Sequence, residues 1–387
     1  MPLDKATLDQ FLETLRRFVD ERLIPAEAEV DATDRVPQAI IDEMKEMGLF
    51  GLTIPEEYGG LGLSMTEEVE VAWTITHAAP AFRSVFGTNV AIGSQGIVID
   101  GTEEQKRKYL PKLASGEFIS SFALTEPDIG SDAGSVKTRA TRDGNGYVLN
   151  GAKRFITNAP TANIFTVMAR TDPEEKGARG VSAFIVDADT PGIRLGKPEN
   201  KMGQKGAHIC DVVFEDCRIP GEALIGGVEG VGFKTAMKVL DRGRLHVAST
   251  CCGLADRLID ESVNFALDRK QFDKEIGEFQ LIQAMLADSR TEHDVAWALV
   301  RDAARRGDAG EPITRMGAEA KYYASEMVGR VADRAVQIHG GSGYINDYAV
   351  SRLYRDVRIY RLYEGTSQIQ QLVIARDMLK EARGKRA

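Results

Sequence analysis

The spacing of apolar residues changes twice along this chain, and this limits the architectures that the sequence can adopt. From Leu8 to Leu23 the apolar residues recur every three or four positions, which predicts an amphipathic helix that Pro25 stops or bends. The same spacing predicts further helices over Gln38–Met47, Glu67–His77 and Glu103–Ala114. The first third of the chain is therefore expected to be helical.

From about Ile119 the apolar residues alternate, which predicts strands. The strand-like runs are Lys137–Arg142, Tyr147–Leu149, Ile164–Arg170, Ala183–Asp187 and Asp211–Phe214. Gly144-Asn145-Gly146 is typical of a hairpin turn between the first two runs.

After a glycine-rich segment at 226–230 the helical spacing returns in long stretches. These stretches are Phe233–Phe265, Gln280–Arg306, Arg315–His339 and Ser367–Glu381. The pattern predicts an α+β multidomain protein with a helical domain at residues 1–118, a β domain at 119–230 and a helical bundle at 231–387. It does not predict how the three parts pack.

Composition excludes several classes of protein. The 387-residue chain has a formal net charge of −9, which argues against nucleic-acid binding because phosphates need a concentrated basic surface. Its five histidines show no metal-ligand spacing, and its four cysteines form no C-x-x-C pair, as expected for buried thiols in a reducing compartment. Met1 to Gln10 contains no apolar leader, and no run approaches the roughly 18 apolar residues of a membrane helix. We therefore expect a cytoplasmic protein without a metal or membrane insertion.

Two distant segments carry candidate chemistry. The first reads Tyr360-Arg361-Leu362-Tyr363-Glu364-Gly365-Thr366-Ser367-Gln368, in which one carboxylate lies between an aromatic residue and a glycine. Aromatic neighbours raise a carboxylate's pKa by desolvation, which suits it to take a proton from carbon. The second segment reads Ala123-Leu124-Thr125-Glu126-Pro127-Asp128-Ile129-Gly130-Ser131-Asp132. Together they resemble the two signatures of the acyl-CoA dehydrogenase family.

The resemblance covers nearly the whole chain and implies a specific architecture. Members of the family have an N-terminal helical domain, a central β-barrel-like domain and a C-terminal four-helix bundle. They bind FAD between the β domain, the bundle and a neighbouring subunit, so we expect a homotetramer or a homodimer. The chain has no G-x-G-x-x-G motif, which agrees with a dinucleotide site that is not a Rossmann fold.

The resemblance also implies which residues contact the flavin. Phe122, Ala123, Leu124 and Thr125 would lie along the ring, and Phe155-Ile156-Thr157 resembles the segment whose hydroxyl reaches flavin N5. Arg269-Lys270-Gln271-Phe272 resembles the motif that meets a neighbouring subunit's pyrophosphate. The remaining cofactor-binding candidates are Gly130, Ser131, Gln280, Gln337, Gly340, Gly341, Thr366 and Gln368. Taken singly, an alternating strand or a glycine helix stop explains several of them equally well.

Substrate contacts follow from the same resemblance. Ser131 would contact the CoA portion, although Ile129 stands where the signature usually has a small residue and could reshape this loop. Asp241 and Arg244 resemble the D-x-x-R segment of the acyl-CoA channel, and a helical charge cluster is the structural alternative. The other substrate-binding candidates are Tyr363, Glu364 and Gly365.

Glu364 is the expected catalytic base. Some family members place the base at a position that is Gly243 here, and glycine cannot accept a proton. The alternative interpretation is a surface glutamate at a helix start. By resemblance, Glu364 would remove the proton α to the thioester carbonyl, the β hydrogen would leave as hydride to the flavin, and an electron-transferring flavoprotein would receive the electrons.

Two variants of this function remain open. An acyl-CoA oxidase would use O2 instead, although those chains are usually longer. Arg83, in Ala81-Phe82-Arg83-Ser84, resembles the arginine with which glutaryl-CoA dehydrogenases bind a distal carboxylate. A solvated or structurally paired arginine at a helix start is the simpler interpretation.

Overall fold

The computed structural model describes residues 3–385 and begins with a helical layer. Its helices are α1 (Lys5–Phe18), α2 (Ile24–Thr33), α3 (Gln38–Glu46), α4 (Met65–Ile75), α5 (Pro80–Val90), α6 (Gln95–Asp100) and α7 (Glu103–Ala114). The predicted break at Pro25 is a π-helical turn, Val19–Leu23, after which the helical backbone continues as α2. Pro25 lies in the first turn of α2.

A seven-stranded sheet follows the helical layer. Its strands are β1 (Ser120–Ala123), β2 (Arg139–Asp143), β3 (Gly146–Thr157), β4 (Ile164–Arg170), β5 (Val181–Asp187), β6 (Ile193–Leu195) and β7 (Ile209–Ile219). The order is β1-β4-β2-β3-β7-β6, and β5 pairs with β4. The predicted hairpin is confirmed, because Asp143 pairs with Gly146 and Gly144 has a positive φ of 59°.

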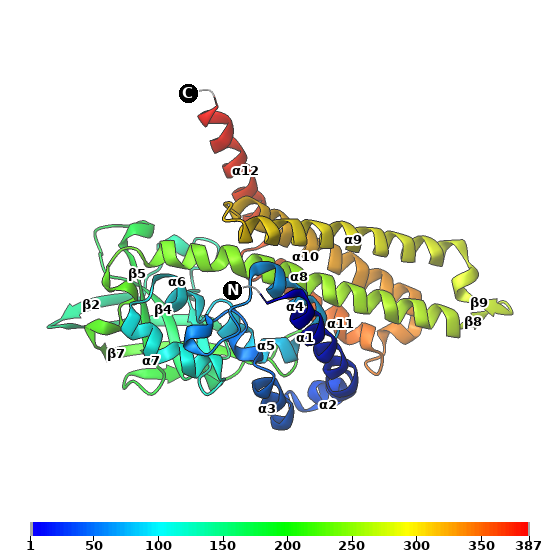
Figure 1. Cartoon of the computed structure of the whole chain (residues 1–387), viewed down its shortest axis with the longest axis horizontal. Helices are drawn as coiled ribbons and strands as arrows, with labels where there is room; N and C mark the ends of the chain where they lie inside the picture. Colours follow the sequence, from blue (N-terminus) through cyan, green and yellow to red (C-terminus); the bar gives the residue numbers. More distant parts are fainter. Residues whose placement is uncertain (1–2, 386–387) are drawn as a thin grey trace.

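The C-terminal part is built from long helices. They are α8 (Gly232–Asp268), α9 (Gln280–Asp308), α10 (Thr314–His339), α11 (Ala349–Val357) and α12 (Ser367–Gly384), and a two-stranded hairpin of β8 (Lys270–Gln271) and β9 (Lys274–Glu275) joins α8 to α9. Figure 1 shows α8 running from the sheet, at one end of the long axis, to the hairpin at the other.

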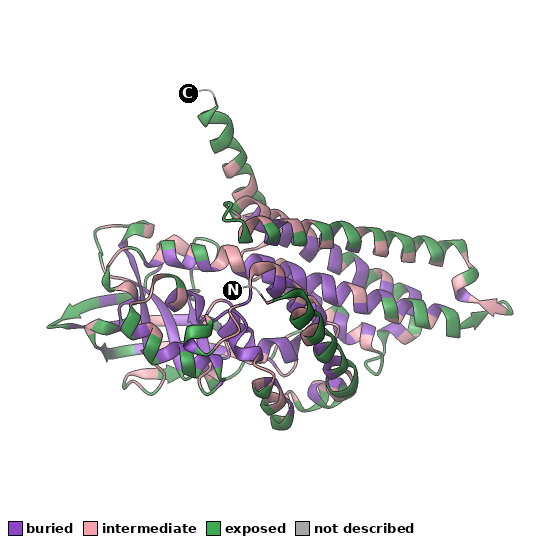
Figure 2. Ribbon diagram, in the orientation of Figure 1, coloured by how far each residue is buried: buried purple, intermediate pink, exposed green. Residues whose placement is uncertain are grey.

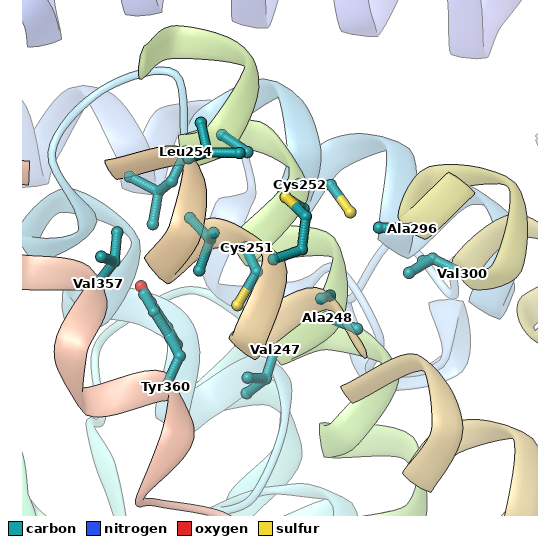
Figure 3. Close-up of a cluster of buried hydrophobic side chains, with 14 of the residues drawn as sticks. Val247, Ala248, Cys251, Cys252, Leu254, Ala296, Val300, Val357 and Tyr360 are labelled. Atoms are coloured by element: carbon teal, nitrogen blue, oxygen red, sulfur yellow. The ribbon is translucent and has the colours of Figure 1, made fainter. Parts of the chain in front are cut away.

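Small side chains let these helices pack closely. In Figure 3, Ala248 and Cys252 of α8 lie on the side of Ala296 and Val300 of α9, all within one buried cluster. Where α8 crosses α4, a Cβ on Gly253 would lie 2.3 Å from the Trp73 carbonyl oxygen, so only glycine fits. Figure 2 shows that buried residues fill the centre of the molecule, whereas α12 is largely exposed where it leaves the body.

The predicted order of helices, strands and long helices is confirmed, and the architecture is the α+β three-part fold with a curled central sheet. The predicted elements omit α2, α5, α6, α11, β1 and β6. Of these, α5 and β1 are buried almost all round, so their sequences lack the polar face that gives a helix or strand its period. No helix among residues 3–385 is both long enough and apolar enough to span a bilayer.

Candidate active site

Glu364 lies in the short connection before α12, in an uncommon backbone conformation. Its φ is 53° and that of Gly365 is 93°, so two consecutive residues are left-handed. A Cβ on Gly365 would lie 2.5 Å from Gln370 Nε2, which explains the glycine at this position. The turn directs the Glu364 side chain inward, toward α8, and the interpretation of Glu364 as a surface residue is wrong.

The Glu364 carboxylate points at Gly243 of α8. A Cβ built on Gly243 would lie only 2.6 Å from Glu364 Oε2, so the missing side chain makes the room that the carboxylate occupies. Oε2 is buried and has no hydrogen-bond partner among residues 3–385. The two candidate positions for a base therefore meet at one point, and only Glu364 supplies a carboxylate there.

Buried charges surround this carboxylate. Burial raises the pKa of Glu364, while Arg83, Lys321 and Arg244 act in the opposite direction. The net effect is a raised pKa, which brings a carboxylate closer to the strength needed to take a proton from carbon. A buried carboxylate without a hydrogen bond is costly for a fold, and such groups are typical of functional sites.

Arg83, on α5, belongs to a buried polar chain. Its Nε donates to His246 Nε2 at 2.8 Å, and His246 Nδ1 lies 2.9 Å from Glu68 Oε1. Because arginine only donates, we assign the neutral tautomer in which His246 accepts at Nε2 and donates from Nδ1 to Glu68. Burial and the Arg83 charge lower the pKa of His246, which agrees with a neutral ring. Arg242 Nε donates to the other oxygen of Glu68 at 2.7 Å.

The two segments expected along the flavin lie side by side at the end of the sheet. Ser121 Oγ donates to the Thr157 carbonyl at 2.7 Å, and the Arg154 N–H donates to the Thr125 carbonyl at 2.8 Å. Within β3 the register shifts between Lys153 and Ile156, and Phe155 there has a φ of 59° and a side chain 52% exposed. The bulge thus turns an aromatic ring outward beside Thr125 and Thr157, whose hydroxyls make no hydrogen bond within the described chain.

The other residues of these two segments can contact a ligand only through backbone groups. The side chains of Ala123 and Ile156 are buried in the core of the sheet, and those of Phe122 and Leu124 are almost fully covered. The loop around Ile92 connects this edge to Glu364. A Cβ on Gly93 would collide with Ser120 Oγ, and Ile92 Cγ2 lies 3.6 Å from the Cβ position of Gly243.

A buried ion pair fixes the first signature. Lys153 is fully buried and donates to Glu126 Oε1 at 2.8 Å and to the Leu124 carbonyl at 3.1 Å. Burial lowers the pKa of Lys153 to about 8, against the opposing charge of Glu126. Ile129 is buried in the adjoining turn, while Gly130 and Ser131 are exposed beyond it. The β-branched residue therefore packs inward and leaves Ser131 accessible.

A second group of predicted cofactor residues lies at the other end of the chain, around the β8–β9 hairpin and the end of α10. All are exposed: Arg269, Gln271, Phe272, Gln280, Gln337, Gly340 and Gly341. Figure 1 places this hairpin and the sheet at opposite ends of the long axis. One protomer therefore does not bring the two groups together.

The remaining candidates lie around the Glu364 turn and the start of α8. Asp241 accepts hydrogen bonds from Arg244 Nη1 at 2.5 Å and from Thr314 Oγ1 at 2.6 Å. Asp241 and Arg244 of the D-x-x-R segment therefore form an ion pair along the helix. The positive charge of Arg244 also acts on Glu364. Thr366 caps α12 by accepting from the Ile369 N–H, and Gln368 is exposed on that helix. Tyr363 packs edge-on against Tyr360 at 5.5 Å.

The structure adds residues that the sequence did not indicate. Glu68, His246, Lys321 and Gln370 are buried polar side chains around the same site. No motif marks them, since a glutamate, lysine or glutamine in an amphipathic helix is normally solvated.

Comparison with known proteins identifies family domains along nearly the whole chain. The acyl-CoA dehydrogenase N-terminal domain matches residues 5–117, the middle domain residues 121–217 and the C-terminal domain residues 230–379. The chain belongs to the acyl-CoA dehydrogenase family. Acyl-CoA dehydrogenases are FAD-dependent oxidoreductases, and the predicted family and enzyme class are confirmed.

Individual relatives cover nearly the full length. The chain is 41% identical over 375 residues to the caffeyl-CoA reductase–Etf complex subunit CarC of Acetobacterium woodii, covering 96% of this chain and 98% of that one. It resembles the structure of butyryl-CoA dehydrogenase from Megasphaera elsdenii with a TM-score of 0.93 and 36% identity, over 98% and 99% of the two chains. An acyl-CoA dehydrogenase from Bacillus anthracis, solved in complex with FAD, gives a TM-score of 0.91 and 33% identity, over 100% of this chain and 69% of that one.

The residues at the sheet edge fit this cofactor. A flavin needs a covered ring face and polar groups at its edge. The outward Phe155 ring and the two free hydroxyls of Thr125 and Thr157 supply these features side by side. These residues would hold the ring, and Ile92 Cγ2 and Glu364 Oε2 both approach the Cβ position of Gly243, at 3.6 and 2.6 Å.

Proposed function

We propose that this protein catalyses α,β-dehydrogenation of an acyl-CoA thioester to the trans-2-enoyl-CoA and passes the electrons to an electron-transferring flavoprotein. The observation that carries this proposal is the buried, unpartnered Glu364 carboxylate facing Gly243. Bound FAD supplies the hydride acceptor for the β hydrogen. Glu364 Oε2 takes the α proton, and backbone N–H groups of its segment are candidates to stabilise the negative charge on the thioester oxygen.

The proposed electron acceptor rests on relatives. One relative is named as a subunit of a caffeyl-CoA reductase–Etf complex. Reduction and dehydrogenation share the same groups, since the acid that protonates Cα in one direction is the base in the other. The four cysteines are all buried free thiols, which suits the cytoplasmic location that we propose.

We also propose that the enzyme is a homotetramer or a homodimer in which Arg269 reaches the cofactor of a neighbouring subunit. This assembly is supported by the position of the two groups of predicted FAD residues, which lie at opposite ends of one protomer (Figure 1). Large apolar side chains are exposed at the hairpin end, with Phe272 87% exposed. Such side chains are normally covered by a partner.

Replacement of Arg269 by Ala is expected to weaken FAD retention, because one charge-assisted contact to the pyrophosphate is lost. FAD content after gel filtration measures this, with Arg305→Ala as the control, since Arg305 is also exposed but lies at the other end of α9. Light scattering of the wild type gives the assembly state. A monomer that carries a full complement of FAD would overturn the proposed assembly.

A second candidate function, dehydrogenation of an acyl-CoA with a distal carboxylate, is favoured by the surroundings of Arg83. Its side chain is 8% exposed, and its only side-chain hydrogen bond within the described chain goes to neutral His246. Glu68, the nearest carboxylate in this chain of contacts, is already bound by His246 and Arg242. One turn on, the guanidinium packs against Gly87, where a Cβ would lie 3.0 Å from Arg83 Cζ.

If Arg83 binds such a carboxylate, glutaryl-CoA will outcompete butyryl-CoA in kcat/KM. Arg83→Ala will then erase the preference at a cost of about 2–5 kcal/mol, as for truncation of a buried charge pair. Arg83→Lys is the matched control, because it keeps the charge and loses the fork. A preference for uncharged acyl chains that both variants leave unchanged would show that Arg83 is structural.

A further inference from the structure

The turn that carries Glu364 is held by two buried side chains from different helices. Lys321, on α10, donates from Nζ to the Gly365 carbonyl at 2.7 Å. Gln370, in the first turn of α12, donates from Nε2 to the carbonyls of Glu364 and Gly365 at 3.1 and 3.0 Å. Both side chains are fully buried. Glu364 is a non-glycine residue in the left-handed region, which is strained and persists only where the surroundings hold it.

Lys321 is an unusual residue to find in this position. A buried ammonium is normally paired with a carboxylate, but Lys321 makes no ion pair among residues 3–385, and its hydrogen bond goes to a neutral carbonyl. Burial lowers the pKa of Lys321 to about 8, although the nearby Glu364 carboxylate acts in the opposite direction. A neutral donor could also satisfy the Gly365 carbonyl. The positive charge of Lys321 is therefore not explained by this hydrogen bond alone.

We propose that Lys321 is a positioning residue for the catalytic base, which holds the left-handed turn through the Gly365 carbonyl and supplies a positive charge that keeps Glu364 ionised. This inference rests on the proposed function of Glu364. Gln370 shares the positioning role without the charge. Mutation of Gln370 therefore tests the geometry of the turn alone, whereas mutation of Lys321 tests both the geometry and the charge.

The other charged groups around Glu364 set the expected direction of change. Arg83 from α5 and Arg244 from α8 also favour the ionised carboxylate, Glu68 from α4 opposes it, and the pKa of Tyr363 in the same turn is raised by burial. Arg244 shares its charge with Asp241, whereas Lys321 has no such partner. Loss of the Lys321 charge therefore raises the pKa of Glu364. The acid limb, which is the fall in the rate of flavin reduction as Glu364 becomes protonated at low pH, then moves to higher pH.

The experiment compares variants of the FAD-loaded enzyme by anaerobic flavin reduction at saturating acyl-CoA between pH 5 and 9. Lys321→Met is expected to slow reduction roughly ten- to hundredfold, because a misplaced group loses the near-attack geometry. Its acid limb should move up by about one pH unit, as for removal of one nearby charge. KM should change little, since Lys321 is not placed on the substrate. Lys321→Arg should keep the limb near the wild-type value.

Gln370→Leu is the matched control. It removes hydrogen bonds from the same turn and no charge, so the rate should fall while the acid limb stays in place. If Lys321→Met does not fold, Lys321→Gln replaces it, and a limb at the wild-type pH in that variant overturns the inference. An unmoved limb in folded, FAD-loaded Lys321→Met also overturns it.

The proposed function fails by a different result. If Glu364→Gln keeps the wild-type rate of flavin reduction, Glu364 is not the base. If Glu364→Gln is inactive and Lys321→Met leaves the acid limb unmoved, only the role of Lys321 is wrong.

Discussion

Replacement of Glu364 by Gln is expected to slow flavin reduction by acyl-CoA about 10²–10⁴-fold, the contribution typical of a general base. The amide keeps the shape that fits against Gly243 but cannot accept a proton. FAD binding should persist, because the residues proposed to hold the ring lie on the sheet. Anaerobic stopped-flow bleaching of the flavin absorbance measures the rate.

The room left by Gly243 provides a sharper control. Since a Cβ on Gly243 points at the place of Glu364 Oε2, the double variant Gly243→Glu with Glu364→Gly should regain part of the lost rate. Gly243→Glu alone should be inactive, because two carboxylates would compete for one space. Bleaching by Glu364→Gln at a near-normal rate would contradict the assignment of the base.

Replacement of Glu68 by Gln is expected to lower the free energy of unfolding by about 3–5 kcal/mol, as when one partner of a buried ion pair is removed. Glu68 is 2% exposed and is the shared acceptor for Arg242 and His246. Its loss leaves the charges of the half-buried Arg242 and the buried Arg83 uncompensated. Urea unfolding of the two proteins measures the difference.

Glu70 provides the comparison on the same helix. It pairs with Arg301, whose side chain is 59% exposed, so Glu70→Gln should cost no more than about 1 kcal/mol. Equal losses for the two variants would show that the buried chain from Arg83 to Arg242 contributes nothing special to stability.

The effect of Glu68 depends on pH in a defined direction. Burial alone raises the pKa of this carboxyl, but Arg242 and His246 outweigh it and hold the pKa at about 2, below the ordinary value of 4.5. A depressed pKa contributes stability above the ordinary value, and this contribution is lost as pH falls toward 2. The stability difference between wild type and Glu68→Gln should therefore be constant above about pH 5 and shrink toward pH 2.

Much of the architecture could be predicted from the spacing of apolar residues, because most helices and strands have one solvent-exposed face. The helix over Gln280–Arg306, for example, corresponds to α9, whose buried residues recur on one side. The signal fails for α5, which is buried on almost every side and carries Arg83. For the same reason the sequence did not show that Arg83 is buried or that it contacts His246, 163 residues away.

The sequence by itself determined which residues are candidates for the chemistry that local motifs encode. Glu364 beside Gly365, Gly243 in place of an alternative base, and the Thr125 and Thr157 segments are all defined by neighbours along the chain. Only the tertiary structure decided what surrounds them. Glu68 on α4, His246 on α8 and Lys321 on α10 lie far apart in sequence and meet only because the helices pack. Burial strengthens the electrostatic interactions of these groups. Burial depends on packing, and no local pattern of residues determines it.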